Sequence, residues 1–124
     1  MRGIRGAITV ERDEKESIWK AAAEMVTTMM ERNGVQPEDI GAAIFSQTED
    51  LRAAFPSAGV RKLVPGFAFV PLFDARQLAI EDSLPQCIRV LLLVETDKAQ
   101  RDIQHVYLGG ARALRPDIVK CVCD

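Results

Sequence analysis

Two arginines stand inside apolar stretches of this sequence. Residues 87–96 read Cys-Ile-Arg-Val-Leu-Leu-Leu-Val-Glu-Thr, which places Arg89 near the start of an aliphatic run, and Arg5 lies between Ile4 and Ile8. A guanidinium group keeps its proton in a protein, so burying it requires an anion close by. Arginine binds carboxylates and phosphates through two parallel hydrogen bonds. The two residues therefore indicate either a bound anion or ion pairs within the chain.

The residues alone leave both alternatives open, because most ion pairs in proteins have no function. The internal alternative has four candidate partners, which follow the arginines closely: Glu11 and Asp13 for Arg5, and Glu95 and Asp97 for Arg89. Tyr107, in a further apolar stretch, would add a hydrogen-bond donor. A tyrosine taken singly is more often a core residue with a satisfied hydroxyl.

Covalent and metal chemistry have no clear signature in the sequence. His105 has no serine or cysteine beside it in a nucleophile motif, and there is no glycine-rich phosphate loop or metal-ligand cluster. Cys121 and Cys123 form one Cys-x-Cys without a second pair, which is a poor zinc site. The implied site has positively charged guanidinium groups and hydrogen-bond donors, without an evident nucleophile or general base. No metal and no cofactor are expected.

Alternating strands and helices must position these side chains. Strands are predicted at residues 3–10, 42–46, 67–71, 88–95 and 104–108. A long helix is predicted from a capping box at Asp13 and Glu16 to Gly34, and a short one over residues 57–63. The fold class is α/β (α+β), a mixed sheet with one long and one short helix. Alternation along the strands places Arg5, Arg89 and Tyr107 at one end of the sheet, and both sheet faces are expected to be covered.

Length and composition limit the classes of function. The 124 residues suit a single domain, and the net charge of −2 gives no broad footprint for nucleic acid or an anionic membrane. The first residues lack a signal-peptide core, and no apolar run reaches membrane-spanning length. We expect a cytoplasmic protein that binds neither nucleic acid nor membranes.

Eight short motifs, in order along the chain, resemble the small monofunctional chorismate mutases of the AroH class. They are Arg2–Asp13, Thr48–Leu51, Phe55-Pro56, Val70-Pro71, Cys87–Val90, Glu95–Asp97, His105–Leu108 and Leu114–Asp117. The resemblance covers residues 1–117 as one chorismate mutase domain. Residues 118–124 are expected to form a flexible C-terminal tail.

The resemblance implies a homotrimer whose sheets pack into a pseudo-α/β-barrel, with active sites at the subunit interfaces. It implies conversion of chorismate to prephenate by an intramolecular [3,3] rearrangement, without cofactor, on the way to phenylalanine and tyrosine. By position, Arg5 would hold one carboxylate, Tyr107 would donate a hydrogen bond nearby, and Arg89 would bind a carboxylate and the ether oxygen. The other substrate-binding residues that it implies are Phe55, Ser57, Arg61, Phe73 and Leu114. Of these, Phe55 would line the pocket from the neighbouring subunit, with Arg61 and Ser57 at its mouth.

One departure from the family's pattern concerns the segment after Val70-Pro71. The family has a cysteine there and a glutamate three residues later, whereas this chain has Asp74 and Gln77. We hypothesise that Asp74 supplies the negative charge and that Gln77 keeps the contact with the substrate hydroxyl. The alternative is that Asp74 merely pairs with Arg76 and that the enzyme is weak or altered.

Two other functions remain as alternatives. One is a trimeric imine or enamine deaminase of similar fold with an interfacial arginine. The other is a noncatalytic protein that binds small dianions. Such a protein would bind a transition-state analogue no better than chorismate, whereas an enzyme binds it far more tightly.

Overall fold

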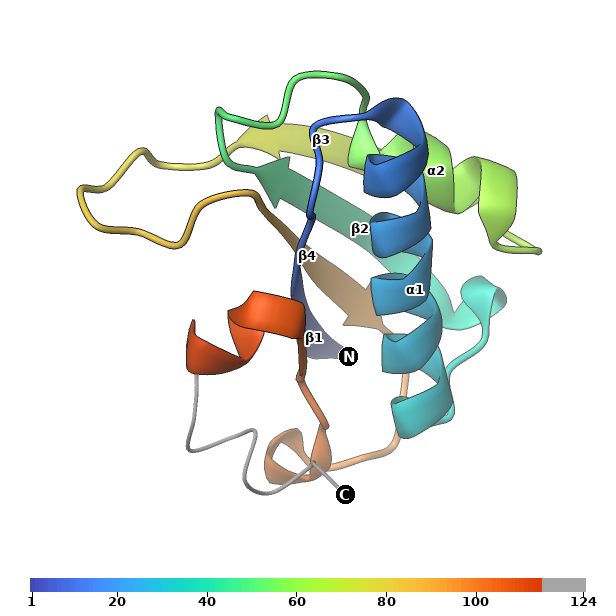
Figure 1. Ribbon diagram of the computed structural model, residues 1–124. Coiled ribbons are helices and arrows are strands. Elements are labelled where there is room, and N and C mark those ends of the chain that lie inside the picture. Colours follow the sequence, from blue (N-terminus) through green and yellow to red (C-terminus); the bar gives the residue numbers. More distant parts are fainter. Residues whose placement is uncertain (115–124) are drawn as a thin grey trace.

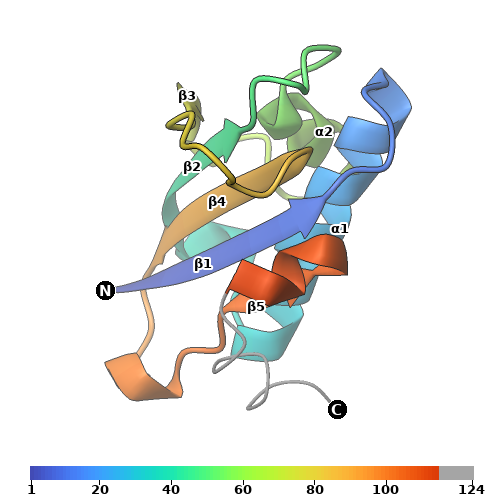
Figure 2. The same ribbon diagram turned by 60° about the vertical axis from the view of Figure 1, so that its left-hand side comes forward.

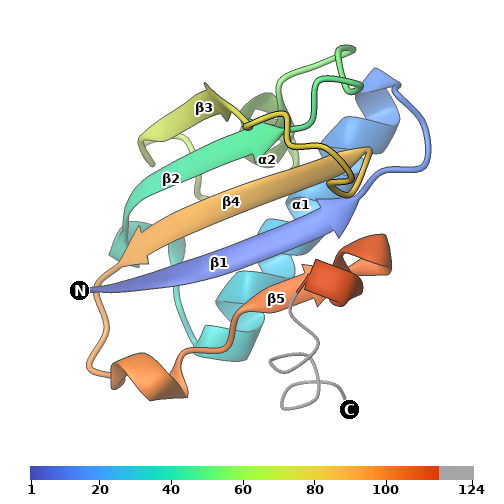
Figure 3. The same cartoon turned by 90° about the vertical axis from the view of Figure 1, so that its left-hand side faces the viewer.

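Five strands form one mixed sheet in the computed structural model, which describes residues 1–114. The strand order is β3-β2-β4-β1-β5 (Figure 3). The strands are β1 Arg2–Thr9, β2 Ile40–Gln47, β3 Leu72–Arg76, β4 Cys87–Val94 and β5 Val106–Leu108. β4 runs antiparallel to both of its neighbours, β1 and β2, while the edge strands β3 and β5 run parallel to β2 and β1.

Two helices cover one face of this sheet. They are α1 Lys15–Asn33 and α2 Pro56–Leu63, and both lie on the same side of the strands (Figure 1). The buried side chains of α1 recur at helical spacing, and Gly34 ends the helix in the left-handed conformation, as predicted. No helix within residues 1–114 has the length and apolar character needed to cross a membrane.

Three short 3₁₀ segments complete the fold: η1 Pro37–Asp39, η2 Gln100–Asp102 and η3 Gly109–Leu114. η1 begins with a reciprocal capping box between Gln36 and Asp39. η3 follows β5 directly and lies beside β1, at the edge of the sheet far from β3 (Figure 2).

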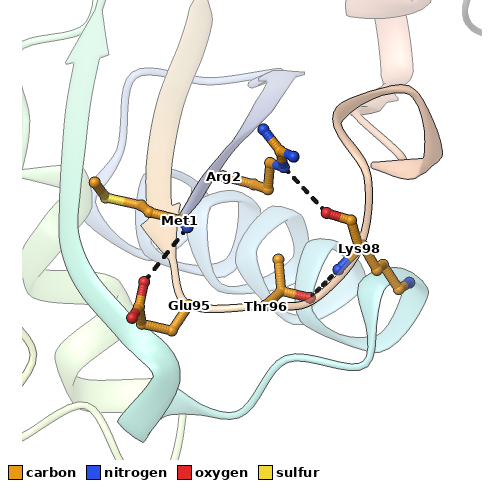
Figure 4. A network of polar contacts seen from close by, with 5 residues as sticks. All are labelled: Met1, Arg2, Glu95, Thr96 and Lys98. Carbon is orange, nitrogen blue, oxygen red and sulfur yellow. Dashed lines mark hydrogen bonds and ion pairs between the residues drawn. The ribbon is translucent and has the colours of Figure 1, made fainter.

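The start of β1 is fixed to the segment that follows β4. The Met1 ammonium lies 3.6 Å from Glu95 Oε1, and Arg2 Nε donates to the Lys98 carbonyl at 3.0 Å (Figure 4). The Lys98 amide donates in turn to Thr96 Oγ1 at 3.3 Å. Glu95, a candidate partner of Arg89, is therefore engaged by the N-terminus instead.

The predicted third strand is wrong. Residues 67–71 form a turn, and β3 begins at Leu72, directly after the predicted strand. Phe67 is buried but Phe69 is 98% exposed, so this apolar run does not lie in the sheet. β3 is held through its parallel pairing with β2, beginning where the Ala43 amide donates to the Pro71 carbonyl at 3.0 Å.

Two smaller predictions are also wrong. Asp13 does not cap α1, whose N-cap is Glu14 without a side-chain hydrogen bond. Asp13 Oδ1 instead accepts hydrogen bonds from the amides of Arg52 and Ala53, at 2.8 and 2.9 Å, and so ties the start of α1 to the segment before α2. The last strand is shorter than predicted, because β5 starts at Val106 rather than at residue 104.

Candidate active site

Arg5 and Arg89 project from the sheet face opposite the helices. In the register, Arg89 on β4 pairs with Ala7 on β1 and Ser46 on β2, while Arg5 on β1 pairs with Leu91 on β4. Because paired residues share a face, both guanidinium groups start from the same side, as diagonal neighbours about 7–8 Å apart at their Cα atoms. We call this the outer face, and it is the side toward the viewer in Figure 3.

Tyr107 joins the two arginines across β1. Ala7 pairs with Arg89 on one side and with Tyr107 on the other, so the three residues form one row on the outer face. The small Ala7 side chain leaves room above β1 for the longer side chains that flank it. Alternation within each strand predicted this common face, but it did not identify Ala7 or Ser46, which depend on the register between strands.

The two key donors are buried and have no hydrogen-bond partner within residues 1–114. They are Arg89 Nε and the Tyr107 hydroxyl. Such groups are usually satisfied, and leaving one unpaired costs about 1–3 kcal/mol. A pocket of about 250 Å³ opens beside Arg89, lined by Arg5, Ser46, Arg89 and neighbouring apolar residues, and Tyr107 does not line it. The site is therefore suited to a ligand that supplies acceptor oxygens.

The alternative of internal ion pairs is not what the described part of the chain shows. Its two ion pairs join the Met1 ammonium to Glu95 and Arg76 to Glu49, and neither involves Arg5 or Arg89. Nor does Arg76 pair with Asp74, as the alternative for that residue required. Within residues 1–114, neither arginine forms an ion pair with a carboxylate.

A small buried cluster includes Tyr107 and lies next to Arg89. It contains Ala7, Cys87, Tyr107 and Ala111, with Leu84 and Leu114 packed against it. η3 is fixed there because the Gly110 amide donates to Thr9 Oγ1 at 2.8 Å. Burial raises the pKa of the Cys87 thiol, and the adjacent Arg89 lowers it in part. Near neutral pH Cys87 is therefore a neutral packing group, not an anion that neutralises Arg89.

A second set of predicted residues gathers around α2 and β3. Phe55 precedes α2 and is 67% exposed, Phe73 on β3 is 65% exposed, and Arg61 is exposed on α2. Ser57, in the first turn of α2, is buried. Asp74 accepts a hydrogen bond from the Ser57 hydroxyl at 2.5 Å and another from the Ser57 amide at 3.3 Å.

Asp74 and Arg89 belong to opposite faces of the sheet. Asp74 pairs with Phe45, which pairs with Val90, and both of these lie in the core under the helices. Arg89 is one residue before Val90 and so points to the outer face. The structure therefore brings Arg5, Arg89, Tyr107 and Leu114 together, and Phe55, Ser57 and Asp74 together, but does not join these two sets within one chain. Phe73 is the exception on β3, because its pairing with Ile44 places it on the outer face.

Gln77 lies just beyond the end of β3, with its Oε1 buried and without a partner among the described residues. It lines a separate pocket of about 450 Å³ between residues 48–50 and residues 78–85. This pocket includes neither the two arginines nor Ser57 and Asp74, so the structure places Gln77 with neither set.

The described residues of the single chain leave the outer face partly exposed. A row of residues crosses it from Phe73 through Ile44 and Leu91 to Arg5. Ile44 and Leu91 are each 37% exposed. Apolar side chains in a row of this kind indicate a surface that packs against something else.

Comparison with known proteins bears on this arrangement. Residues 1–118 match the model of the family described as chorismate mutase type I. The chain is 49% identical to the chorismate mutase AroH of Thermus thermophilus over 119 residues, covering 95% of this chain and 96% of the relative. It is 42% identical to the AroH of Bacillus subtilis (strain 168) over 118 residues, covering 95% and 92%.

A solved structure agrees with these relatives. A chorismate mutase from Clostridium thermocellum superposes with a TM-score of 0.86 at 39% identity, covering 90% of this chain and 97% of that one. The outer-face arginines and the mixed sheet that carries them thus occur in a chain similar to chorismate mutases over nearly its whole length. The chain belongs to the chorismate mutase type I family.

Proposed function

We propose that this protein is a chorismate mutase, an isomerase that converts chorismate to prephenate on the route to phenylalanine and tyrosine. The observation that carries the proposal is a pair of buried donors, Arg89 Nε and the Tyr107 hydroxyl, which have no partner within residues 1–114 and lie on the same sheet face as Arg5. Chorismate has two carboxylates and an ether oxygen, and these are the acceptors that such donors lack.

The rearrangement needs no nucleophile, because one C–O bond breaks while one C–C bond forms within the same molecule. Negative charge develops on the ether oxygen as its bond to carbon lengthens. A guanidinium group fixed at that oxygen stabilises the transition state more than the substrate, and this is the role of Arg89. Arg5 and Tyr107 hold a carboxylate. Together with the contacts of Arg89, they favour the compact substrate conformer in which the two carbons that form the new bond approach each other.

A homotrimer with sites between subunits follows from the same proposal. Asp74 and Arg89 point from opposite faces of one sheet, so a single chain cannot present both to one substrate. A second copy packed against the outer face would bring its α2 and β3 residues opposite Arg5 and Arg89, and would cover the row through Ile44 and Leu91. A trimer is the symmetric arrangement that the family resemblance implies. The cytoplasmic location stays a prediction.

Asp74 supplies the negative charge in this proposal, in place of the glutamate that the family has at position 77. As electrons leave the ring in the transition state, a nearby carboxylate stabilises the positive charge that develops there. The support is that Asp74 does not pair with Arg76 and is hydrogen-bonded to Ser57 of the same set. Gln77 keeps the contact with the substrate hydroxyl.

Loss of chorismate absorbance with the purified protein is the direct test. We expect multiple turnovers, the appearance of prephenate, and binding of a bicyclic transition-state analogue far tighter than binding of chorismate. Equal affinity for analogue and substrate, without turnover, would indicate a noncatalytic dianion binder. Hydrolysis of 2-iminopropionate without prephenate formation would identify the protein as a deaminase.

Mixed assemblies test the site between subunits. Arg89→Ala inactivates one half of each site and Asp74→Asn weakens the other half. In trimers of the two variants co-expressed at equal levels, about one quarter of the interfaces combine two intact halves. The activity of the mixed trimers should therefore be well above the mean activity of the two variants assayed separately. Co-expression of the Arg89→Ala and Arg5→Ala variants is the matched control. Both changes lie in the same half of the site, so no interface has two intact halves and no recovery of activity is expected.

A further inference from the structure

Ser57 contacts Asp74 with both of its donors. The hydroxyl donates to Asp74 Oδ2 at 2.5 Å and the backbone amide donates to Asp74 Oδ1 at 3.3 Å. Each carboxylate oxygen thus has its own partner on a single residue. Because a hydrogen bond between a hydroxyl and a carboxylate is charge-assisted, this contact is among the stronger polar contacts available to the chain.

The surroundings favour a fixed carboxylate at this point. Ser57 is the second residue of α2, which begins at Pro56, and the first amides of a helix carry no intrahelical partner. The positive end of the helix dipole favours a negative group there. Asp74 also lies on an edge strand, where β2 is the neighbour that holds its backbone. The Ser57 contact therefore sets the side-chain conformation of Asp74.

Ser57 has no second proton for a substrate. A serine hydroxyl is one donor, and this proton already goes to Asp74. The side chain is also buried, with 6% of the residue exposed. These facts are at odds with the expectation that Ser57 itself binds chorismate.

We propose that Ser57 is a positioning residue that acts on the reaction through Asp74, by holding its carboxylate as a fixed negative charge. This inference rests on the proposed function, in which Asp74 stabilises the positive charge of the transition state. A charge held before the reaction starts needs no reorganisation while the bonds exchange, and this is why a second residue that fixes it increases the rate.

The competing account is that the contact only joins α2 to β3. A purely structural contact would contribute to the thermal stability of the fold and would leave kcat unchanged in folded protein. A direct substrate contact would instead change KM, whatever residue occupies position 74. The three accounts therefore differ in what they predict for kcat, KM and Tm.

A double-mutant cycle separates them, with wild type, Ser57→Ala, Asp74→Asn and the double variant assayed for kcat, KM and Tm. We expect Ser57→Ala to lower kcat about tenfold, as for the loss of one charge-assisted hydrogen bond, with KM within about twofold. In the Asp74→Asn background the same change should alter kcat by less than about twofold. Ser57→Thr, which keeps the hydroxyl, should restore most of kcat. Ser17→Ala in α1 is the control for a serine that has no contact with β3.

Four results would overturn the inference. They are an equal loss of kcat in both backgrounds, a rise in KM alone, a fall in Tm with kcat intact, and a Ser57→Thr protein as slow as Ser57→Ala. If Asp74→Asn retains the full kcat/KM while wild type forms prephenate, the roles of Asp74 and Ser57 both fail but the chorismate mutase function stands. If wild type forms no prephenate, the proposed function itself fails.

Discussion

Gly59 of α2 lies directly against the backbone of Trp19 in α1. A Cβ atom built on Gly59 would stand 2.5 Å from the Trp19 Cα and 2.8 Å from its Cβ, distances that real side chains do not adopt. The missing side chain at position 59 thus sets how closely the two helices approach. Because α2 carries Ser57 and Arg61, this contact also sets where one half of the site stands.

Gly59→Ala should therefore destabilise the fold and impair the site together. Trp19 cannot retreat, since its own backbone is the obstacle, so α2 must move outward. We expect a loss of about 1–3 kcal/mol in the free energy of unfolding, as for an overpacked core, with a lower kcat/KM. Chemical denaturation and steady-state kinetics measure both. Gly41→Ala is the control, because its Cβ would meet nothing closer than 3.6 Å, and an equal effect of the two changes would refute the argument.

Arg89→Lys tests the planar fork of the side chain. Lysine keeps the charge but cannot span a carboxylate and the ether oxygen with fixed geometry. We expect kcat to fall on the order of 10²-fold or more, comparable to the loss of one oxyanion donor, with Tm nearly unchanged. The exposed Arg101 offers the matched control Arg101→Lys, which should be silent. A kcat within threefold of wild type would remove Arg89 from the role proposed for it.

Tyr107→Phe should separate activity from stability. The Tyr107 hydroxyl is buried and has no partner within the described residues, so removing it takes nothing from the described contacts. We expect Tm to stay constant or to rise, while kcat/KM falls about tenfold through the loss of one hydrogen bond to the substrate. A lower Tm with unchanged kcat/KM would mean that the hydroxyl serves the fold and not the ligand.

Cys87 should make the fold sensitive to alkaline pH. Burial raises the pKa of its thiol above the ordinary value of 9.0, with partial opposition from Arg89. As the pH passes about 9.0, the unfolded thiol ionises first, so the unfolded state binds fewer protons and the free energy of unfolding falls. Below that pH both states hold the proton and Cys87 has no effect on the pH dependence.

The measurement compares Tm from pH 7 to pH 10.5 for wild type and Cys87→Ala. We expect Cys87→Ala to be the less stable protein at pH 7, because it leaves a small cavity, but to lose less stability on the way to pH 10.5. The other ionising groups are common to both proteins and cancel in the difference. Parallel plots of Tm against pH for the two proteins would show that burial does not raise the pKa of the Cys87 thiol.

The fold was largely predictable because its central elements carry strong local signals. α1 follows from the spacing of its apolar residues and from Gly34, and β4 follows from its aliphatic run. β3 was missed because its stability is not local: its five residues mix apolar, acidic and basic types, and they form a strand through pairing with β2. The apolar run at residues 67–71 was the stronger local signal for a strand. It forms a turn instead, in which Phe69 is exposed to solvent.

The common face of Arg5, Arg89 and Tyr107 was predictable from the sequence, but the orientation of Asp74 was not. Alternation along single strands was enough to place Arg5, Arg89 and Tyr107 on one face. The assignment of Asp74 to the opposite face depends on the parallel register of β3, which the sequence does not show. For the same reason, the contact of Ser57 with Asp74 could not be foreseen, because it joins two elements whose relative position is set by the packing of α2 on α1.

The position of β1 between β4 and β5 has a consequence for biosynthesis. β1 is an inner strand that is translated before both of its partners, which lie at residues 87–94 and 106–108. Until those residues emerge, β1 has two open edges and Arg5 has no neighbour across the sheet. Pairing between such distant segments is slow and leaves strand edges exposed in the meantime. We expect the nascent chain to complete its sheet only after residues 106–108 have left the ribosome.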